Sequence, residues 1–476
     1  MDNLLPAWLS YLLLAGFSLL WLYLGYVLGK KNHSFEDHAL AGRNVGLTMA
    51  VTTAVATWIT SNTTMLAPQF VLQLGVWGAL AYSTASLGLF LFAPLAERIQ
   101  QILPHAYTVG DFIRLRFGRV TWIIFLLFSL FYSLTWLLSM AMAGGILLES
   151  ISGISYHIGM SVILFVCVLY TIRGGLLAVI ATDFVQSILI LIGIVALGIG
   201  ILQHVSLEEI YQKTATTKPY LLKIAFPAAL IALFNNLLFG IGEIFHSNVW
   251  WSRAFSFRKG IGKKAYFLSG LIWLPVPIAA GFTALAAAAL GVNIPSPDMV
   301  GPLVAVKVFG KIGAVVVFVI VFSSLASSID SLLAATSDMF ARDVLQNLFA
   351  KELFAKELSE KTMKKAAQYS TIGIALVVWL ACLPRIGSLA TVLFFAGPLV
   401  GSMIWPILAG LYWQRTGSNV AMSAMLLGAS VGLWSYFYFD WYTGALAATT
   451  VSMLVVLVGS YLSKNRFDWQ ELERGK

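Results

Sequence analysis

Charged residues and cysteines are scarce in this sequence. Only 11% of its 476 residues are charged, whereas 59% are hydrophobic and the mean hydropathy is +0.85. A water-soluble fold cannot bury that much apolar surface, so the composition excludes a soluble globular protein and indicates a polytopic membrane protein. The two cysteines, Cys167 and Cys382, lie inside apolar segments, which excludes a disulfide framework and a cysteine-based zinc site.

Clusters of catalytic residue types are also missing. The six histidines are scattered along the chain, and no His/Asp pair has the spacing of metal ligands. This absence argues against a membrane enzyme. The charged tail 464–476 is too short to be the signalling domain of a sensor, so we expect neither an enzyme nor a sensor.

Long apolar segments make up most of the sequence. Segments of roughly 20 residues, the length that crosses a bilayer, predict an all-α fold with about thirteen transmembrane helices. No proline- or serine-rich linker separates them, so we expect one integral domain over residues 1–476. The predicted spans are 7–28, 46–72, 75–97, 120–149, 156–172, 176–203, 221–250, 266–291, 305–341, 367–384, 388–412, 418–438 and 442–463.

Basic residues orient these helices. If the N-terminus is outside and the helices alternate in direction, about 24 of the Lys and Arg residues fall on one side of the membrane and about 6 on the other. This bias predicts an outside N-terminus and a cytoplasmic C-terminus in the plasma (inner) membrane. The formal net charge of +9 therefore reflects membrane topology, and we expect no nucleic-acid partner.

Two predicted spans are interrupted at corresponding places. The second contains "AVATWITSNTTM", where β-branched and hydroxylated residues replace good helix formers. The seventh contains "FNNLLFGIGEIFHSNVWW", which carries Asn235, Asn236, Gly240, Gly242, Glu243 and His246 at membrane depth. Paired interruptions five helices apart predict an inverted-repeat transporter with a binding site near the bilayer midplane.

Serines form a stripe on the ninth predicted span. Ser324, Ser327, Ser328 and Ser331 recur at helical spacing, with Asp330 at the edge of the stripe. Neutral hydroxyls and the free carbonyls of a broken helix are suitable ligands for a small hard cation such as sodium. Close helix packing, with each serine bonded to its own backbone, is the alternative.

Four short motifs stand in order along the chain: "LAGRNVG", "TVGDFIRLRFG", "YTIRGGLLAVIATDFVQ" and "SSLASSIDSLLAATSDMFARDV". Together they resemble the sodium:solute symporter family. The resemblance implies the leucine-transporter type of fold, with two five-helix repeats in inverted orientation. It places the first repeat at 46–203 and the second at 221–412. An extra helix at 7–28, two extra helices within 418–463 and a cytoplasmic tail at 464–476 complete the expected organisation.

The resemblance also implies the ligands of a transported sodium ion, with no organic cofactor. They are the carbonyls of Ala56, Ile59 and Ser324 and the hydroxyls of Ser327 and Ser328. Asp183 matches a family acid on the inner exit path of the ion. The alternative for Asp183 is a structural partnership with a basic group such as Arg173.

Polar residues beside the two interruptions are candidate substrate contacts. Among them, Glu243 is a lone intramembrane carboxylate, which marks a ligand, a proton step or a buried partner such as His246. We expect Trp250 and Trp251 to anchor the chain at the membrane interface. The candidate set is Ser61, Asn62, Thr63, Asn235, Asn236, Phe239, Glu243 and Asn248.

These observations predict a monomeric, sodium-coupled symporter that imports a small polar organic solute by alternating access. Some segments resemble the urea-permease branch of the family and others the choline branch. Urea is the first choice of substrate, and choline, an amino acid, a sugar or a carboxylate remain alternatives. Proton coupling through Glu243 or Asp330 is the alternative to sodium coupling.

Overall fold

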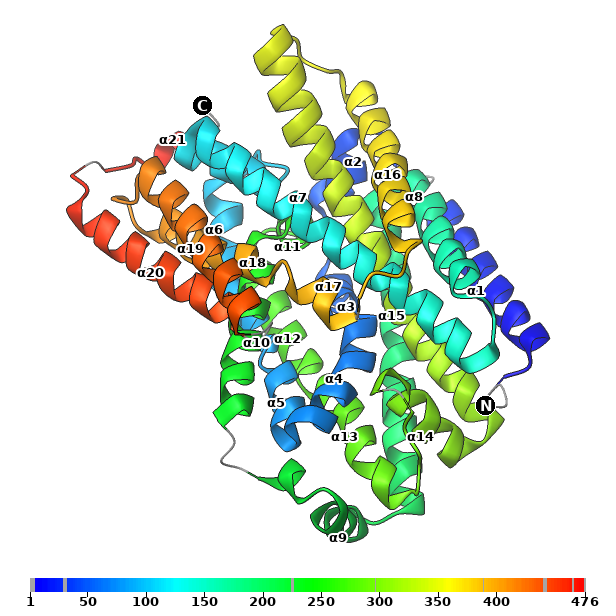
Figure 1. The fold of residues 1–476 in the computed structure, drawn as a ribbon. Helices are drawn as coiled ribbons and strands as arrows, with labels where there is room; N and C mark the ends of the chain where they lie inside the picture. Colours follow the sequence, from blue (N-terminus) through cyan, green and yellow to red (C-terminus); the bar gives the residue numbers. More distant parts are fainter. Residues whose placement is uncertain are drawn as a thin grey trace.

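The computed structural model describes residues 5–28, 32–223, 227–295, 297–387, 389–439, 443–464 and 466–474. Within these ranges the regular structure is helical, and one isolated bridge joins Val45 to Phe257. The predicted all-α fold is therefore confirmed. Figure 1 shows long helices packed side by side around α15, with α1 at one edge and α19 and α20 at the other.

The first half of the chain contains α1 (Ala7–Leu28), α2 (Phe35–Leu40), η2 (Ala41–Arg43), α3 (Leu47–Trp58), α4 (Ser61–Leu74), α5 (Val76–Ser83), α6 (Ser86–Ile102), α7 (Val109–Ser152), α8 (Tyr156–His204), α9 (Leu207–Thr217) and η3 (Pro219–Leu222). The second half contains α10 (Pro227–His246), α11 (Asn248–Ser256), α12 (Gly262–Trp273), α13 (Pro275–Ala289), η4 (Pro297–Met299), α14 (Val300–Phe309), α15 (Lys311–Met339), η5 (Phe340–Leu353), α16 (Glu360–Cys382), α17 (Leu389–Phe394), α18 (Gly397–Tyr412), α19 (Ser418–Tyr438), α20 (Gly444–Leu462) and α21 (Gln470–Arg474).

Ten helical segments of the described chain are long and apolar enough to cross a membrane. The apolar helices α3, α14 and α18 are shorter. The spans predicted at 156–172 and 176–203 form the two arms of α8, which bends at Gly175. Gly175 has a φ of +56°, and a side chain there would collide with the backbone of His38, so glycine is required at this bend.

Both predicted interruptions are present as breaks in helices. The first break separates α3, which ends at Trp58, from α4, which begins at Ser61. There the Thr60 hydroxyl accepts from the Thr63 amide and the Thr63 hydroxyl accepts from the Thr60 amide, each at 3.2 Å. This capping box satisfies backbone groups that the break frees at a buried position.

The second break separates α10, which ends at His246, from α11, which begins at Asn248. The Ser247 hydroxyl caps α11 by accepting from the Val249 amide at 3.4 Å. Both α3 and α11 pack against α15, and α8 packs along the same helix. The two breaks therefore meet the serine-bearing helix in the centre of the molecule.

Two short helices mark opposite ends of the bundle in Figure 1. The amphipathic helix α9 lies at one end and α21 lies at the opposite end. This arrangement agrees with the charge pattern, which predicts that the segment around 204–218 and the tail 464–476 lie on opposite sides of the membrane.

Candidate ion and solute sites

A buried polar cluster surrounds Asp183 on α8. Its carboxylate Oδ1 accepts from the Ser327 hydroxyl at 2.5 Å, and its Oδ2 accepts from Thr53 at 2.5 Å and from Thr57 at 3.4 Å. All four side chains are fully buried. The carboxylate therefore joins α3, α8 and α15, three elements that are far apart in the sequence.

Arg253 of α11 supplies the positive charge of this cluster. Its Nη2 lies 3.3 Å from Asp183 Oδ2 and donates to Thr57 Oγ1 at 2.7 Å and to Ser331 Oγ at 2.6 Å. Its Nε donates to Thr53 Oγ1 at 3.1 Å, and the side chain is fully buried. A buried ion pair is tolerated only when its remaining hydrogen-bonding groups are satisfied, as they are here. We name Thr53, Thr57, Asp183, Arg253, Ser327, Ser328 and Ser331 the polar cluster.

Sequence reasoning missed Arg253, although an arginine shortly after a membrane-depth segment was a usable signal. The alternative that Asp183 pairs with a basic group is confirmed, but the partner is Arg253 and not Arg173, whose guanidinium lies over the Tyr26 ring at 4.3 Å. The prediction that Trp250 and Trp251 anchor the chain at the membrane interface is also wrong. Both are fully buried, and they donate to Glu243 and to the Phe245 carbonyl.

Two of the predicted sodium ligands, Ser327 and Ser328, belong to the polar cluster, and the others lie on α15 and at the end of α3. Ala56 and Ile59 are fully buried at the end of α3. The Ser328 hydroxyl lies 2.9 Å from the Ser324 carbonyl and 3.4 Å from the Thr57 carbonyl, so this serine spans the gap between α15 and the break. The single hydroxyl hydrogen of Ser327 is donated to Asp183, which leaves its lone pairs available to a cation.

These contacts bring neutral oxygen atoms from α3 and α15 together around one buried location. In the described part of the chain, no group of three or more His, Cys, Asp or Glu side chains could hold a metal ion. The groups of this region that could bind a cation are therefore neutral hydroxyls and carbonyls, which lie beside a carboxylate whose charge is compensated.

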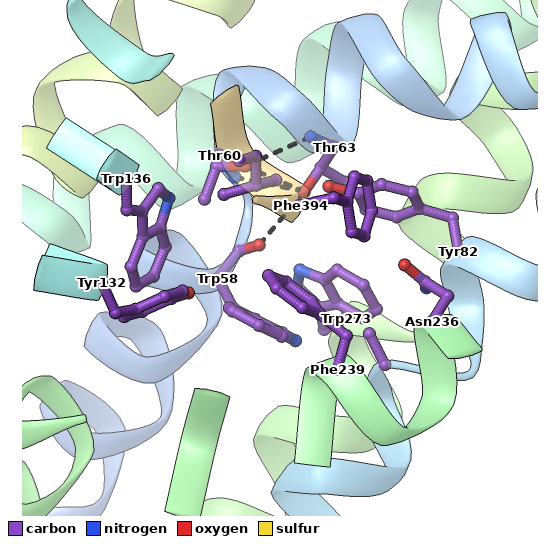
Figure 2. A pocket seen from close by; sticks show the side chains of 12 residues that line it. Trp58, Thr60, Thr63, Tyr82, Tyr132, Trp136, Asn236, Phe239, Trp273 and Phe394 are labelled. Carbon is purple, nitrogen blue, oxygen red and sulfur yellow. Dashed lines mark hydrogen bonds between the residues drawn. The ribbon is translucent and has the colours of Figure 1, made fainter. Parts of the chain in front are cut away.

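A narrow pocket lies next to the same break (Figure 2). It leaves about 30 Å³ for the centres of water-sized molecules, room for about two waters. Trp58 forms one wall, with its ring centroid 5.7 Å from that of Trp273 and 6.1 Å from that of Trp136. The lining residues of this aromatic pocket are Trp58, Thr60, Thr63, Tyr82, Ala85, Tyr132, Trp136, Asn236, Phe239, Trp273, Leu393 and Phe394.

Three of the predicted substrate contacts line the aromatic pocket: Thr63, Asn236 and Phe239. The Thr63 hydroxyl donates to the Trp58 carbonyl at 3.2 Å, and the Asn236 amide donates to the Ala81 carbonyl at 2.7 Å. Both residues are thus held at the pocket wall by bonds to neighbouring backbone, and Figure 2 shows them on two different helices.

The other predicted contacts have partners away from this pocket. Ser61 donates to Met140 Sδ at 3.3 Å, and the side chain of Asn62 lies outside the described residues. Asn235 Oδ1 accepts from the Ala445 and Leu446 amides at 3.1 and 3.2 Å, so it caps α20.

Glu243 and Asn248 have structural partners as well. Glu243 accepts from Trp250 Nε1 at 3.1 and 3.2 Å, whereas His246 Nδ1 lies 2.6 Å from the Gly242 carbonyl. The suggested Glu243–His246 pair is therefore absent from the structure. Asn248 donates to the Ala335 carbonyl at 2.8 Å and accepts from the Val109 amide at 3.1 Å.

The polar cluster and the aromatic pocket share one helix break. Thr57 belongs to the cluster, and the adjacent Trp58 belongs to the pocket. Broken membrane helices around buried sites for an ion and a solute define the class of secondary active transporters.

Within that class, residues 38–428 match the family described as "Sodium:solute symporter family". The chain belongs to this family and is a sodium-coupled solute symporter. The resemblance found in the sequence motifs is thereby confirmed.

Named relatives cover most of the chain. The osmoregulated proline transporter OpuE of Bacillus subtilis (strain 168) is 25% identical over 471 residues, which are 93% of this chain and 92% of that protein. The urea-proton symporter DUR3 of Oryza sativa subsp. japonica is 24% identical over 87% of this chain and 62% of its own length.

A solved structure of a Na⁺-coupled sialic acid symporter, in a substrate-bound outward-open state, superposes with a TM-score of 0.79. The alignment covers 96% of this chain and 98% of that chain at 18% identity. At this identity the likeness establishes the fold alone.

Proposed function

We propose that sodium binds between the first break and α15, held by the carbonyls of Ala56, Ile59 and Ser324 and the hydroxyls of Ser327 and Ser328. The observation that carries this proposal is the pair of contacts of Ser328, which approaches carbonyls of both α3 and α15. A bound cation would replace these hydrogen bonds and draw the two helices together.

Asp183 acts on this site indirectly in our proposal. Its Oδ1 accepts a hydrogen bond from the Ser327 hydroxyl. This bond orients the hydroxyl so that the lone pairs of its oxygen face the ion. Arg253 compensates its charge, so the site keeps no excess negative charge when sodium leaves for the cytoplasm. Asp183 therefore stands on the proposed exit path as the residue that orients Ser327.

We propose that the solute binds in the aromatic pocket, with Thr63, Asn236 and Phe239 among its contacts. None of the twelve lining residues is charged, and five carry hydroxyl or amide groups. Burying a net charge without a counter-charge is costly, so this lining favours a small neutral polar solute over choline or a free carboxylate.

Urea meets these conditions and remains the first choice of substrate. Proline is the second candidate, because a bound sodium ion could balance its carboxylate and because the Bacillus relative is named for proline. Uptake and thermal-shift measurements with urea, proline, choline, a sugar and a carboxylate, each with and without sodium, distinguish the candidates. Sodium-dependent stabilisation by choline alone would contradict the proposal of a neutral solute.

We also propose that the protein imports its solute and acts as a monomer. Its C-terminus is cytoplasmic in this proposal, and it has no enzymatic activity. The charge bias of the loops supports the orientation, and the transporter family supports the absence of catalysis. Labelling of single cysteines in the α9 and α21 segments from each side of sealed vesicles tests the orientation. Labelling of α21 from outside would overturn it.

Ser328→Ala tests the sodium site. The variant loses one hydroxyl ligand, and we expect the sodium concentration for half-maximal uptake to rise by about tenfold, a change of roughly 1.4 kcal/mol. Ser323→Ala is the matched control, because Ser323 is equally buried on α15 but forms no part of the proposed site. Equal sodium dependence in the two variants would contradict the assignment.

Proton coupling is the competing mechanism, since the rice relative is named a urea-proton symporter. Two buried carboxylates could carry the proton: Glu243, which accepts from Trp250 Nε1 at 3.1 Å, and Asp330, whose Oδ2 accepts from the Tyr170 hydroxyl at 2.7 Å. Uptake at fixed pH in sodium-free, potassium-balanced medium separates the mechanisms. Undiminished uptake there would overturn sodium coupling.

A further inference from the structure

A second cavity lies where α18 and α20 end and the C-terminal segment 466–474 begins. Its volume is about 660 Å³. Its lining residues are Tyr412, Trp413, Gln414, Arg415, Leu457, Ser460, Tyr461, Arg466 and Trp469. None of these residues belongs to the polar cluster or to the aromatic pocket, so the cavity has no part in the transport site. We call it the C-terminal cavity.

Arg98, Arg116, Arg415 and Arg466 lie at this end of the molecule, and the first two form hydrogen bonds to α18. Arg98 Nε donates to the Leu411 carbonyl at 2.5 Å, and Arg116 Nε donates to the Gly410 carbonyl at 3.1 Å. Both guanidinium groups also lie over the Trp469 ring, at 4.9 and 5.6 Å from its centroid. These two arginines hold the C-terminal segment against α18.

The other two arginines, Arg415 and Arg466, line the cavity and are exposed. Among the residues that the structure describes, neither has a hydrogen bond or an ion pair, and no lining residue is acidic. The cavity therefore carries two positive charges without an ion-pair partner, beside the hydroxyl and amide groups of Ser460 and Gln414. This set of groups is complementary to a phosphate, which arginine binds through paired hydrogen bonds.

The surroundings of the cavity are those of a membrane interface. Tyr412, Trp413 and Tyr461 are 42%, 38% and 82% exposed, as expected for the aromatic residues that stand at the level of lipid headgroups. Leu457, which lines the cavity, is 42% exposed, and the neighbouring Val458 of α20 is 57% exposed. An apolar helix face therefore leads from the cavity along the membrane-spanning part of α20.

We propose that the C-terminal cavity binds the headgroup of an anionic phospholipid. Arg415 and Arg466 contact the phosphate, and an acyl chain lies along the exposed face of α20 at Leu457. The charge bias predicts this side to be cytoplasmic, the side on which anionic lipids attract basic residues. The bound lipid links α18, α20 and the C-terminal segment, so it stabilises this corner of the fold.

The test uses the full-length protein purified in a neutral detergent. It is titrated with phosphatidylglycerol or with phosphatidylcholine of identical acyl chains, and binding is followed by native mass spectrometry and thermal unfolding. We expect phosphatidylglycerol to bind more tightly and to raise the unfolding temperature. Arg415→Gln with Arg466→Gln should weaken its binding by roughly fivefold per arginine, about 25-fold in all.

Lys263→Gln with Lys264→Gln is the matched control, because it removes the same charge from exposed side chains near the end of α6. Full binding in this control supports a phosphate contact at the cavity, as does binding in Arg415→Lys with Arg466→Lys that is weaker than in the unchanged protein but stronger than in the double glutamine variant. Equal affinity for the two lipids, or unchanged binding in the double glutamine variant, overturns the proposal. Equally tight binding of glycerol 3-phosphate, which has no acyl chains, would show a soluble phosphate site instead of a lipid site.

Discussion

The polar cluster around Asp183 and the aromatic pocket beside Trp58 share one helix break, yet they are built in opposite ways. The cluster joins hydroxyls to a buried ion pair, with hydrogen bonds as short as 2.5 Å. The pocket is walled by rings whose centroids lie 5.7 and 6.1 Å from that of Trp58, and none of its lining residues is charged.

This difference fits the two cargoes that we propose for these places. A sodium ion needs several oxygen atoms at fixed positions, which a satisfied hydrogen-bond network holds rigidly. A small organic solute needs apolar surface and a few polar contacts. Because Thr57 and Trp58 are adjacent in α3, any movement of this helix end changes both sites together. Such a link is what coupling between ion and solute requires.

The largest expected effect comes from breaking the ion pair of the polar cluster. Arg253→Gln leaves Asp183 buried and unpaired, which should destabilise the protein by about 3–5 kcal/mol. Thermal unfolding of the purified variant measures this loss, and sodium-driven uptake should fall with it. Arg253→Gln combined with Asp183→Asn removes both charges and should recover part of the stability. A double variant no more stable than Arg253→Gln would contradict the role of the pair.

Asn235 and Asn236 are adjacent in the sequence, but Asn236 lines the aromatic pocket whereas Asn235 caps α20. Asn236→Ala removes a polar group from the pocket wall, and we expect the solute concentration for half-maximal uptake to rise by about tenfold, or roughly 1.4 kcal/mol. Asn235→Ala removes a cap of α20 and should lower stability by about 1 kcal/mol while leaving solute affinity intact. Uptake kinetics and thermal unfolding of the two variants measure the contrast. Reversed effects would show that Asn235 faces the solute.

The smallest effect concerns pH, and it arises outside both sites. Burial in α2, with a contribution from the charge of Lys364, lowers the pKa of His38 to about 4. The nearest carboxylate oxygen, on Asp338, is 3.9 Å away from Nε2. Because the folded pKa is below the unfolded value, the unfolded chain takes up the proton first, and stability falls as the pH falls below about 6.5 toward 4.

At about pH 5.5 this loss should be about 1 kcal/mol, measured as a fall in unfolding temperature relative to neutral pH. His38→Asn removes the titrating group and should flatten this part of the pH profile. A profile unchanged in His38→Asn would assign the pH dependence to another group, with the carboxylates of α15 next to be tested.

Much of the fold could be predicted from the sequence because its signals are local. Apolar length and composition identified a helical membrane protein, and β-branched and hydroxylated residues identified the break after Trp58. The order of four motifs identified the family, which the match over residues 38–428 confirms. The stripe of serines on α15 was visible because helical spacing alone places Ser324, Ser327, Ser328 and Ser331 on one face.

The partners of these residues were decided only by the tertiary structure. Spacing indicates which residues share a face of a helix, but it does not indicate which helix that face meets. Arg253 pairs with Asp183 across 70 positions of sequence, Asn236 faces the pocket while Asn235 caps α20, and Trp250 is buried against Glu243. The sequence by itself determined the class of protein and the chemistry available on α15. Packing of distant helices decided which groups are charge-compensated, which are exposed to a solute and which only support the fold.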